Sequence, residues 1–172
     1  MVWCIEVKNK NFLVRRNNKL QFTGNCERIN RAVENDSKLE GTIGIEDLKY
    51  KEFGWEVYPF LEVVNVHDIM FSHYFTSGVM GRPCASARLM LQKKHMSCVA
   101  GHVQSHEIAN MYKADGTEIV GLFCGTAYEG HHTYLGAQGQ NHYRGIWMLK
   151  NVKDGAFSPV PYTLDELKAR YE

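Results

Sequence analysis

Short apolar runs separated by turn residues follow one another along most of this 172-residue chain. Runs rich in Val, Ile and aromatic residues predict strands, and apolar residues three or four positions apart predict helices. The predicted strands are 2–7, 11–14, 20–23, 60–66, 68–73, 97–100, 107–112, 118–124, 142–152 and 156–162, and the predicted helices are 27–36, 44–54, 85–94 and 163–171. Strands interspersed with helices indicate a mixed α/β layered domain.

Gly, Pro, Asn and Asp residues mark the connections between these elements. Two hairpin turns are predicted, at His67-Asp68 and at Ala114-Asp115-Gly116. Residues 76–83 and 125–140 are rich in glycine and predict loops, the second of them long and on the surface. Thr163, with a glutamate three residues later, has the pattern of a capping box and predicts the start of the last helix.

The composition is that of an ordinary globular protein, with 44% hydrophobic residues, 23% charged residues and a net charge of +1. Its length predicts a single domain over 1–172. This charge favours neither nucleic acid nor an anionic membrane, and no apolar run approaches the roughly 20 residues of a spanning helix. The N-terminus lacks the order of a signal peptide, and five cysteines without a Cys-x-x-Cys pattern indicate reduced thiols. We therefore expect a soluble, cytoplasmic protein.

The first 24 residues are basic, contain no Asp or His, and have Glu6 as their only acid. The cations are Lys8, Lys10, Arg15, Arg16 and Lys19. One interpretation is the solvated face of a hairpin. The alternative is a small basic patch that contacts the phosphates of a nucleic acid or an acidic protein partner.

Three stretches place polar side chains where an apolar run gives way to turn residues. They are Gly24-Asn25-Cys26-Glu27-Arg28, Phe71-Ser72-His73, and the run from Ala100 to His106. A Gly-Asn pair at the end of a strand favours a tight turn that leaves the amide oxygen free to face a ligand or metal. The histidines of the other two stretches are candidate ligands of the same kind.

In this order the three stretches resemble the calcineurin-like metallophosphoesterases, and more closely the small relatives encoded by phages and prophages. The family pattern is Asp-x-His, Gly-Asp, Gly-Asn-His-Glu/Asp, a lone His after a strand, and Gly-His-x-His. Gly24-Asn25-Cys26-Glu27 matches the third block, His73 the lone His, and Gly101-His102-Val103-Gln104 the last block. The first two blocks have no counterpart, so we expect a divergent segment over 1–24 and an N-terminally incomplete phosphoesterase-like body over 25–172.

This resemblance implies a β-sandwich flanked by helices, with metal ligands on loops at strand ends. Enzymes of the family use two metal ions to polarise the phosphate and activate a water molecule. Asn25, His73 and His102 match three ligands of the second metal, and its bridging carboxylate is absent. Gln104 replaces a ligand of the first metal, which we expect to be lost. The cofactor is therefore expected to be none or one weakly held Mn, Ni or Zn ion, with His106 as a possible replacement ligand.

Cys26 stands where the resemblance places the catalytic His of the family. A thiol is a poorer acid for that task and carries no positive charge, so the expected role is an inert, half-buried Cys. The alternative is a nucleophilic or metal-binding thiolate, favoured if the N-terminus of the following helix lowers its pKa. The corresponding alternative for His73 and His102 is that they are buried, hydrogen-bonded remnants of a former site. The other histidines, His95, His131, His132 and His142, are expected on the surface or in loops.

Two functions follow from the resemblance. The preferred one is a phage-type relative that has lost most of its dinuclear site and binds a protein partner, such as a component of a host defence system, or oligomerises through exposed strand edges. The other is an active phosphodiesterase or phosphatase that uses a single metal ion or obtains the missing carboxylates from a separate chain.

Overall fold

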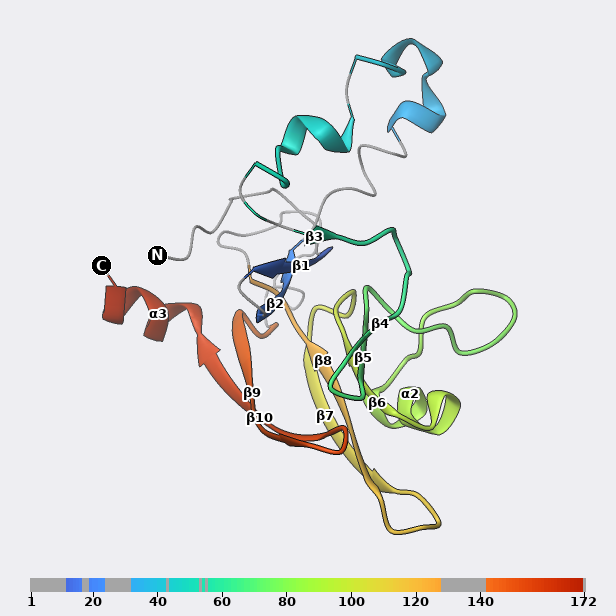
Figure 1. Ribbon diagram of the computed structural model, residues 1–172, viewed down its shortest axis with the longest axis vertical. Coiled ribbons are helices and arrows are strands. Elements are labelled where there is room, and N and C mark those ends of the chain that lie inside the picture. The colour runs from blue at the N-terminus through green and yellow to red at the C-terminus, as the bar shows by residue number, and fades with distance from the viewer. Residues whose placement is uncertain are drawn as a thin grey trace.

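A five-stranded mixed sheet forms the centre of the molecule in the computed structural model, which describes residues 12–16, 19–23, 32–42, 44–52, 54, 56–127 and 142–171. Its strands are β4 (Val64–Val66), β5 (Ile69–Ser72), β6 (Ser97–Ala100), β7 (His106–Tyr112) and β8 (Glu118–Cys124), in the spatial order β4-β5-β6-β8-β7 (Figure 1). The central strands β5, β6 and β8 are parallel, and both outer strands are antiparallel to their neighbours. The carboxyl ends of the three parallel strands therefore meet at one edge of the sheet.

Helix α2 (Ala87–Lys94) connects the parallel strands β5 and β6. The Ser86 hydroxyl accepts the Leu89 N–H and begins the helix, and His95 ends it in the left-handed conformation with its N–H donated to the Leu91 carbonyl. The helix packs closely on β8, because a Cβ added at Gly121 lies 3.0 Å from the Ala87 carbonyl. A glycine at this position is thus a packing requirement.

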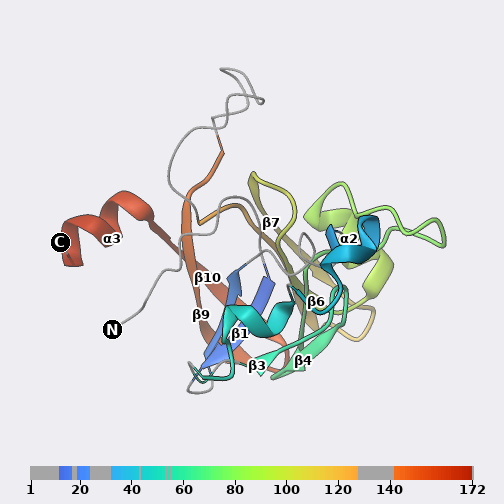
Figure 2. The same ribbon diagram turned by 90° about the horizontal axis from the view of Figure 1, so that it is seen from above.

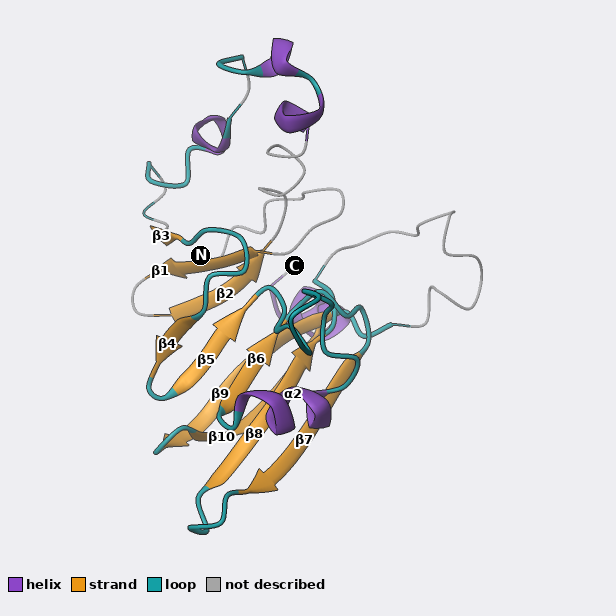
Figure 3. Cartoon of the chain, turned by 90° about the vertical axis from the view of Figure 1, so that its right-hand side faces the viewer, coloured by secondary structure: helices purple, strands orange, loops and turns teal. Residues whose placement is uncertain are grey.

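Alternating side chains give the sheet two apolar faces. The face toward α2 buries a cluster of Phe75, Cys84, Ala87, Met90, Cys98, Ala100 and Phe123. The opposite face buries Ile69, Phe71, Val99, Val120 and Leu122 against Phe157 of a separate hairpin, β9 (Gly145–Lys153) and β10 (Ala156–Thr163). Figures 2 and 3 show this hairpin and α2 on opposite sides of the sheet. The result is a helix–sheet–hairpin layer structure that confirms the predicted mixed α/β class.

Three further strands form a small sheet in the order β2-β1-β3, with bounds β1 (Phe12–Arg16), β2 (Lys19–Thr23) and β3 (Glu56–Val57). Two 3₁₀ turns, η1 (Ser37–Leu39) and η2 (Ile45–Leu48), lie between β2 and β3 in the chain. Helix α3 (Leu164–Tyr171) follows β10, and its predicted capping box is confirmed: the Glu166 carboxylate accepts the Thr163 N–H at 2.8 Å, and the Thr163 hydroxyl accepts the Glu166 N–H at 3.2 Å.

Most predicted elements from residue 60 onward are confirmed, with boundaries that shift where a turn intervenes. The predicted strand 60–66 begins only at Val64, because the Glu62 N–H bonds the Pro59 carbonyl and Leu61 has a φ of +64°. The predicted strand 142–152 begins at Gly145. The turn at His67-Asp68 is confirmed, with both residues at positive φ as a two-residue hairpin of type I′ requires.

One predicted helix is wrong. The described residues of 44–54 form the 3₁₀ turn η2 and no α-helix, and the turn ends at Lys49 in the left-handed conformation. The Asp47 carboxylate accepts the Gly44 N–H, so the first turn is capped but does not continue. Of the predicted helix 27–36, residues 32–35 are helical and 27–31 lie outside the described residues, as does the predicted strand 2–7. In the described part of the chain, no helix is long and apolar enough to cross a membrane.

Candidate functional site

The carboxyl edge of the parallel strands is where an open α/β sheet usually binds its ligand. Ser72 of β5 pairs with Ala100 of β6, so the residues that follow these two strands leave the sheet side by side. His73 comes directly after β5, and His102 comes two residues after β6. The parallel pairing therefore brings together two of the predicted ligands, which are 29 residues apart in the sequence.

His73 and His102 form a close pair of imidazoles. The distance from His73 Nε2 to His102 Nδ1 is 3.2 Å, and the ring centroids are 5.2 Å apart in an edge-to-face arrangement. The His73 side chain is half-buried and that of His102 is exposed. Tyr74 and Phe60 complete the cluster, with the Tyr74 ring 4.9 Å from His102 and the Phe60 ring 5.3 Å from His73. We call these four residues the histidine-pair cluster.

The backbone at His102 is strained. Its φ is +61°, a value that disfavours any residue with a Cβ, and the Val103 N–H bonds the Gly101 carbonyl at 2.6 Å across it. A hydrogen bond from an N–H to the carbonyl two residues earlier defines a γ-turn, and the positive φ of the central residue makes it the rare type. The Gly101 N–H bonds the His73 carbonyl at 3.1 Å and ties the turn to the end of β5. Lys49, His67, Asp68 and His95 adopt similar positive φ values at turns and helix ends, so this backbone conformation positions His102 but does not by itself assign it a function.

Of the other predicted site residues, Gln104 and His106 lie in the described part of the chain and several others lie outside it. Asn25 and Cys26 lie outside the described residues, as do His131 and His132. Gln104 is half-buried in the short connection between His102 and β7. Among the basic residues of the N-terminal segment, Lys8 and Lys10 are outside the described part of the chain, whereas Arg16 of β1 pairs in register with Lys19 of β2 and Arg15 pairs with Leu20.

His106 begins β7, as expected from its strand-like context, and contacts a different set of aromatic rings. Its ring centroid lies 4.9 Å from that of Tyr143 and 5.6 Å from that of Trp147, and these two rings are 5.1 Å apart. We call these three residues the His106 cluster. Sequence reasoning did not find it, because its members come from β7 and from the β9 region and meet only when the hairpin packs on the sheet.

Hydrogen bonds fix the His106 cluster to the backbone. Trp147 Nε1–H donates to the Cys124 carbonyl at 2.8 Å, and the Tyr143 hydroxyl lies 3.2 Å from the carbonyls of Ile146 and Tyr162. Burial is the main reason that the pKa of the Tyr143 hydroxyl is raised. A neutral phenol that donates to backbone carbonyls is a packing element, so this cluster joins the hairpin to the sheet.

The three described cysteines are free thiols. Cys84 and Cys98 are buried on the α2 face, and burial raises the pKa of Cys98 to about 12 and that of Cys124 also to about 12. Burial also raises the pKa of Cys84, against the lowering effect of Lys94. Burial therefore favours the protonated, weakly nucleophilic form of these thiols at neutral pH.

Among the described residues, the imidazoles of His73 and His102 are the predicted metal ligands that come together at this edge. Within the described residues no group of three or more His, Cys, Asp or Glu side chains is arranged to hold a metal ion. A tetrahedral zinc ion binds imidazole nitrogens at about 2.0–2.1 Å, which separates two of them by roughly 3.3–3.4 Å. The observed 3.2 Å fits joint ligation of one ion as well as it fits a direct N–H···N hydrogen bond.

Comparison with known proteins adds no relative. The chain matches no protein-family model, no curated protein and no solved structure.

Proposed function

We propose that this protein is a phage-type relative of the calcineurin-like metallophosphoesterases that has lost most of its dinuclear centre and acts by binding a protein partner. The observation that carries the proposal is the 3.2 Å approach of His73 Nε2 to His102 Nδ1 at the carboxyl ends of adjacent parallel strands. These are the residues that the resemblance matches to two ligands of the second metal. A contact between them was not predictable from their spacing, so it supports the resemblance independently of the motifs.

Two substitutions inside the matched motifs favour binding over catalysis. Cys26 occupies the place of the family's catalytic His, and an ordinary thiol supplies neither a proton near neutral pH nor a positive charge. Gln104 occupies the place of a ligand of the first metal, and an amide oxygen is a neutral, weak donor. In this proposal the chain retains the framework that positions the site but lacks the groups that make phosphoester hydrolysis efficient.

The partner that we propose is a protein, and a component of a host defence system is the class that the phage-type resemblance suggests. The N-terminal basic residues are a second surface in this proposal, suited to an acidic protein or to nucleic acid. Arg15 and Arg16 lie on β1 and Lys19 lies on β2 of one antiparallel hairpin, in which Arg16 pairs in register with Lys19.

A second candidate function is a phosphodiesterase with a single metal ion. The nitrogen–nitrogen distance of the histidine pair favours it, because that distance fits two ligands of one ion. His73, His102 and, by resemblance, Asn25 would hold the ion, which would supply Lewis-acid polarisation of a phosphoester oxygen. Two imidazoles and an amide leave the charge of a dication uncompensated, so binding would be weak.

Hydrolysis of bis-p-nitrophenyl phosphate with added Mn, Ni or Zn distinguishes the two candidates. For the binding protein we expect the same residual rate from wild type, His73→Ala and His102→Ala at every metal concentration. His106→Ala is the matched control, because it removes an imidazole from the other cluster at the same edge. A metal-dependent rate that is lost in the first two variants and kept in the control would establish the enzyme instead.

The binding role has its own test. Affinity capture from host lysate uses two baits, the wild type and a variant in which Arg15, Arg16 and Lys19 are replaced by Ser. We expect a retained protein with at least one of these baits. If neither bait retains any protein above the level of an unrelated bait of similar size, the binding proposal fails even when the hydrolysis assay is negative.

A further inference from the structure

Strand β7 is an open edge of the five-stranded sheet. It is the outermost strand after β8, and among the described elements Figure 3 shows none on its far side. Its pairing with β8 is continuous from His106 to Tyr112, without a bulge. Proteins usually protect an edge of this length with proline, lysine, a bulge or a covering loop, and β7 (HEIANMY) contains no proline and no lysine.

The backbone groups that face the open side can be assigned from the hydrogen bonds of the hairpin. The Lys113 N–H donates to the Thr117 carbonyl at 2.9 Å, which makes this pair a hydrogen-bonded pair of the antiparallel ladder. Such pairs alternate with non-bonded pairs along two strands. The Val120 N–H agrees with this phase, because it donates to Ser97 Oγ and so points away from its β7 partner Asn110. Ile108, Asn110 and Tyr112 therefore direct their N–H and C=O groups to the open edge.

The sequence of this edge is complementary to itself in one antiparallel register. When Asn110 faces Asn110 of a second copy, Ile108 faces Tyr112 and Glu107 faces Lys113. The first of these pairs joins two side chains that are 44% and 69% exposed in the single chain. The second joins opposite charges. Cross-strand pairs of both kinds stabilise sheets, and like charges in such positions destabilise them.

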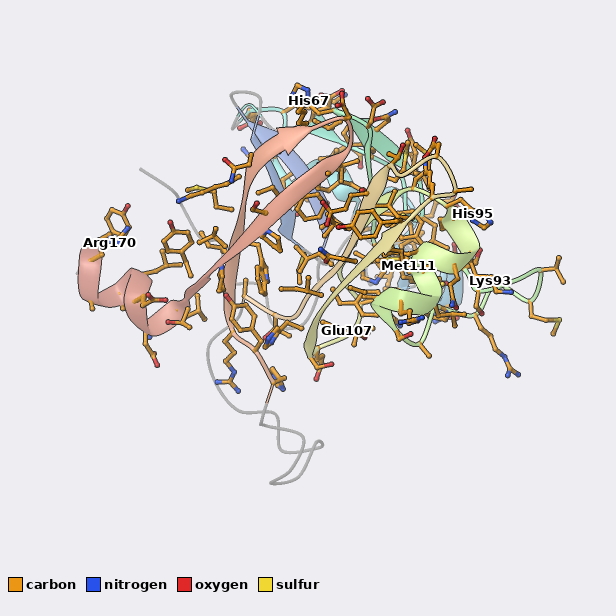
Figure 4. The ribbon with its side chains drawn as sticks, turned by 90° about the horizontal axis from the view of Figure 1, so that it is seen from below. His67, Lys93, His95, Glu107, Met111 and Arg170 are labelled. Carbon is orange, nitrogen blue, oxygen red and sulfur yellow. The ribbon has the colours of Figure 1, made fainter. Side chains whose placement is uncertain are left out.

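The two pairs lie on different faces of β7. Residues 106, 108, 110 and 112 are the exposed positions of its alternating pattern, whereas Ala109 packs into the cluster under α2. Figure 4 shows Glu107 and Met111 along this strand with α2 beside Met111. The Glu107–Lys113 pair thus falls on the face of the helix, and the Ile108–Tyr112 pair falls on the opposite face.

We propose that two copies of this chain join through β7, antiparallel and centred on Asn110, to form a continuous ten-stranded sheet. A second copy is the occupant because the edge supplies both halves of each complementary pair, which is what a two-fold interface requires. A single strand pairing buries little area compared with a stable dimer, so the dimer is weak and depends on concentration. This inference does not rest on the proposed function, and either one can fail without the other.

Charge exchange tests the register. In sedimentation equilibrium the apparent mass of the wild type should rise from that of a monomer to that of a dimer as the protein concentration rises to the millimolar range. Lys113→Glu and Glu107→Lys should each weaken the dimer about tenfold or more, because each places like charges opposite one another twice. The double variant Glu107→Lys, Lys113→Glu should restore it, which also shows that the single variants failed at the interface and not in folding.

Lys150→Glu is the matched control, since it changes the same exposed residue type on β9, and it should dimerise like the wild type. A wild type that stays monomeric throughout would overturn the proposal, as would a Lys113→Glu variant that behaves like this control or a double variant that stays monomeric.

A second measurement is cross-linking. Asn110→Cys should form a symmetric disulfide under mild oxidation, because facing residues of a bonded pair are about 5.5 Å apart. Absence of this cross-link in a dimeric Asn110→Cys protein would exclude the register.

Discussion

Two histidine-containing clusters share one edge of the sheet and differ in what holds them. In the histidine-pair cluster, His73 and His102 turn their nitrogens toward each other at 3.2 Å, and the backbone of His102 is strained. In the His106 cluster, the single imidazole lies against the rings of Tyr143 and Trp147 on a regular strand. The first arrangement brings two imidazole nitrogens together at a residue with a left-handed backbone. The second consists of ring packing and backbone hydrogen bonds, so it serves stability.

The largest difference between the clusters should appear in the free energy of unfolding. Trp147→Ala removes a large ring from between the hairpin and the sheet and leaves the Cys124 carbonyl without its 2.8 Å donor. We expect a loss of about 3–5 kcal/mol in urea denaturation. His73→Ala, the control in the other cluster, should change the free energy by about 1 kcal/mol or less. Equal losses would mean that both clusters are structural.

A smaller effect concerns the backbone conformation at His102 and His106. Replacing Ala by Gly should change the free energy of unfolding in opposite directions at these two positions. At position 102, Gly should be more stable than Ala by about 1 kcal/mol, because only Gly accepts a φ of +61° without strain. At position 106, on strand β7, Gly should be less stable than Ala by about 0.5–1 kcal/mol, since glycine loses more entropy in a strand. Thermal or urea denaturation of the four variants gives both differences. A more stable Ala than Gly at position 102 would show that His102 is not strained.

The smallest expected effect is on the reactivity of the Cys124 thiol, whose backbone carbonyl accepts the Trp147 hydrogen bond of the His106 cluster. Burial raises the pKa of Cys124 to about 12, so at pH 8 only about one thiol in ten thousand is a thiolate that iodoacetamide can alkylate. Trp147→Ala should open the site and raise labelling at Cys124 a few-fold, measured by peptide mass spectrometry. Cys98, whose pKa burial also raises to about 12, is the reference on the other face of the sheet. A parallel rise at both residues would indicate global opening, which contradicts a local role for Trp147.

The elements of the sheet could be predicted from the sequence because local chemistry specifies them. The strands around His67-Asp68 and Ala114-Asp115-Gly116 follow from apolar runs that flank strong turn residues, and α3 follows from its capping box. The failure at 44–54 has a local cause too. Gly44 and Gly54 enclose a segment in which Lys49 adopts the left-handed conformation after one 3₁₀ turn, so too few residues remain for an α-helix.

The site was predictable only as a list of residues. His73 and His102 were identified from the motifs, but their contact depends on the parallel register of β5 and β6, which no local pattern encodes. His106 was considered as a replacement ligand for the same metal. Its ring instead packs on Tyr143 and Trp147, because the β9–β10 hairpin covers that face of the sheet. Contacts between layers of this kind require the tertiary structure.

Zinc titration followed by two-dimensional NMR of the imidazole signals tests the central claim most directly. If His73 and His102 are the remnant of a metal centre that now lacks anionic ligands, their signals should shift together and saturate only in a large excess of zinc, while the His106 signals stay unchanged. Simultaneous saturation at one equivalent of zinc would contradict the account, because it would require carboxylate ligands and an intact centre. Unchanged signals from the pair would contradict it equally, since the two nitrogens would then be no ligand site.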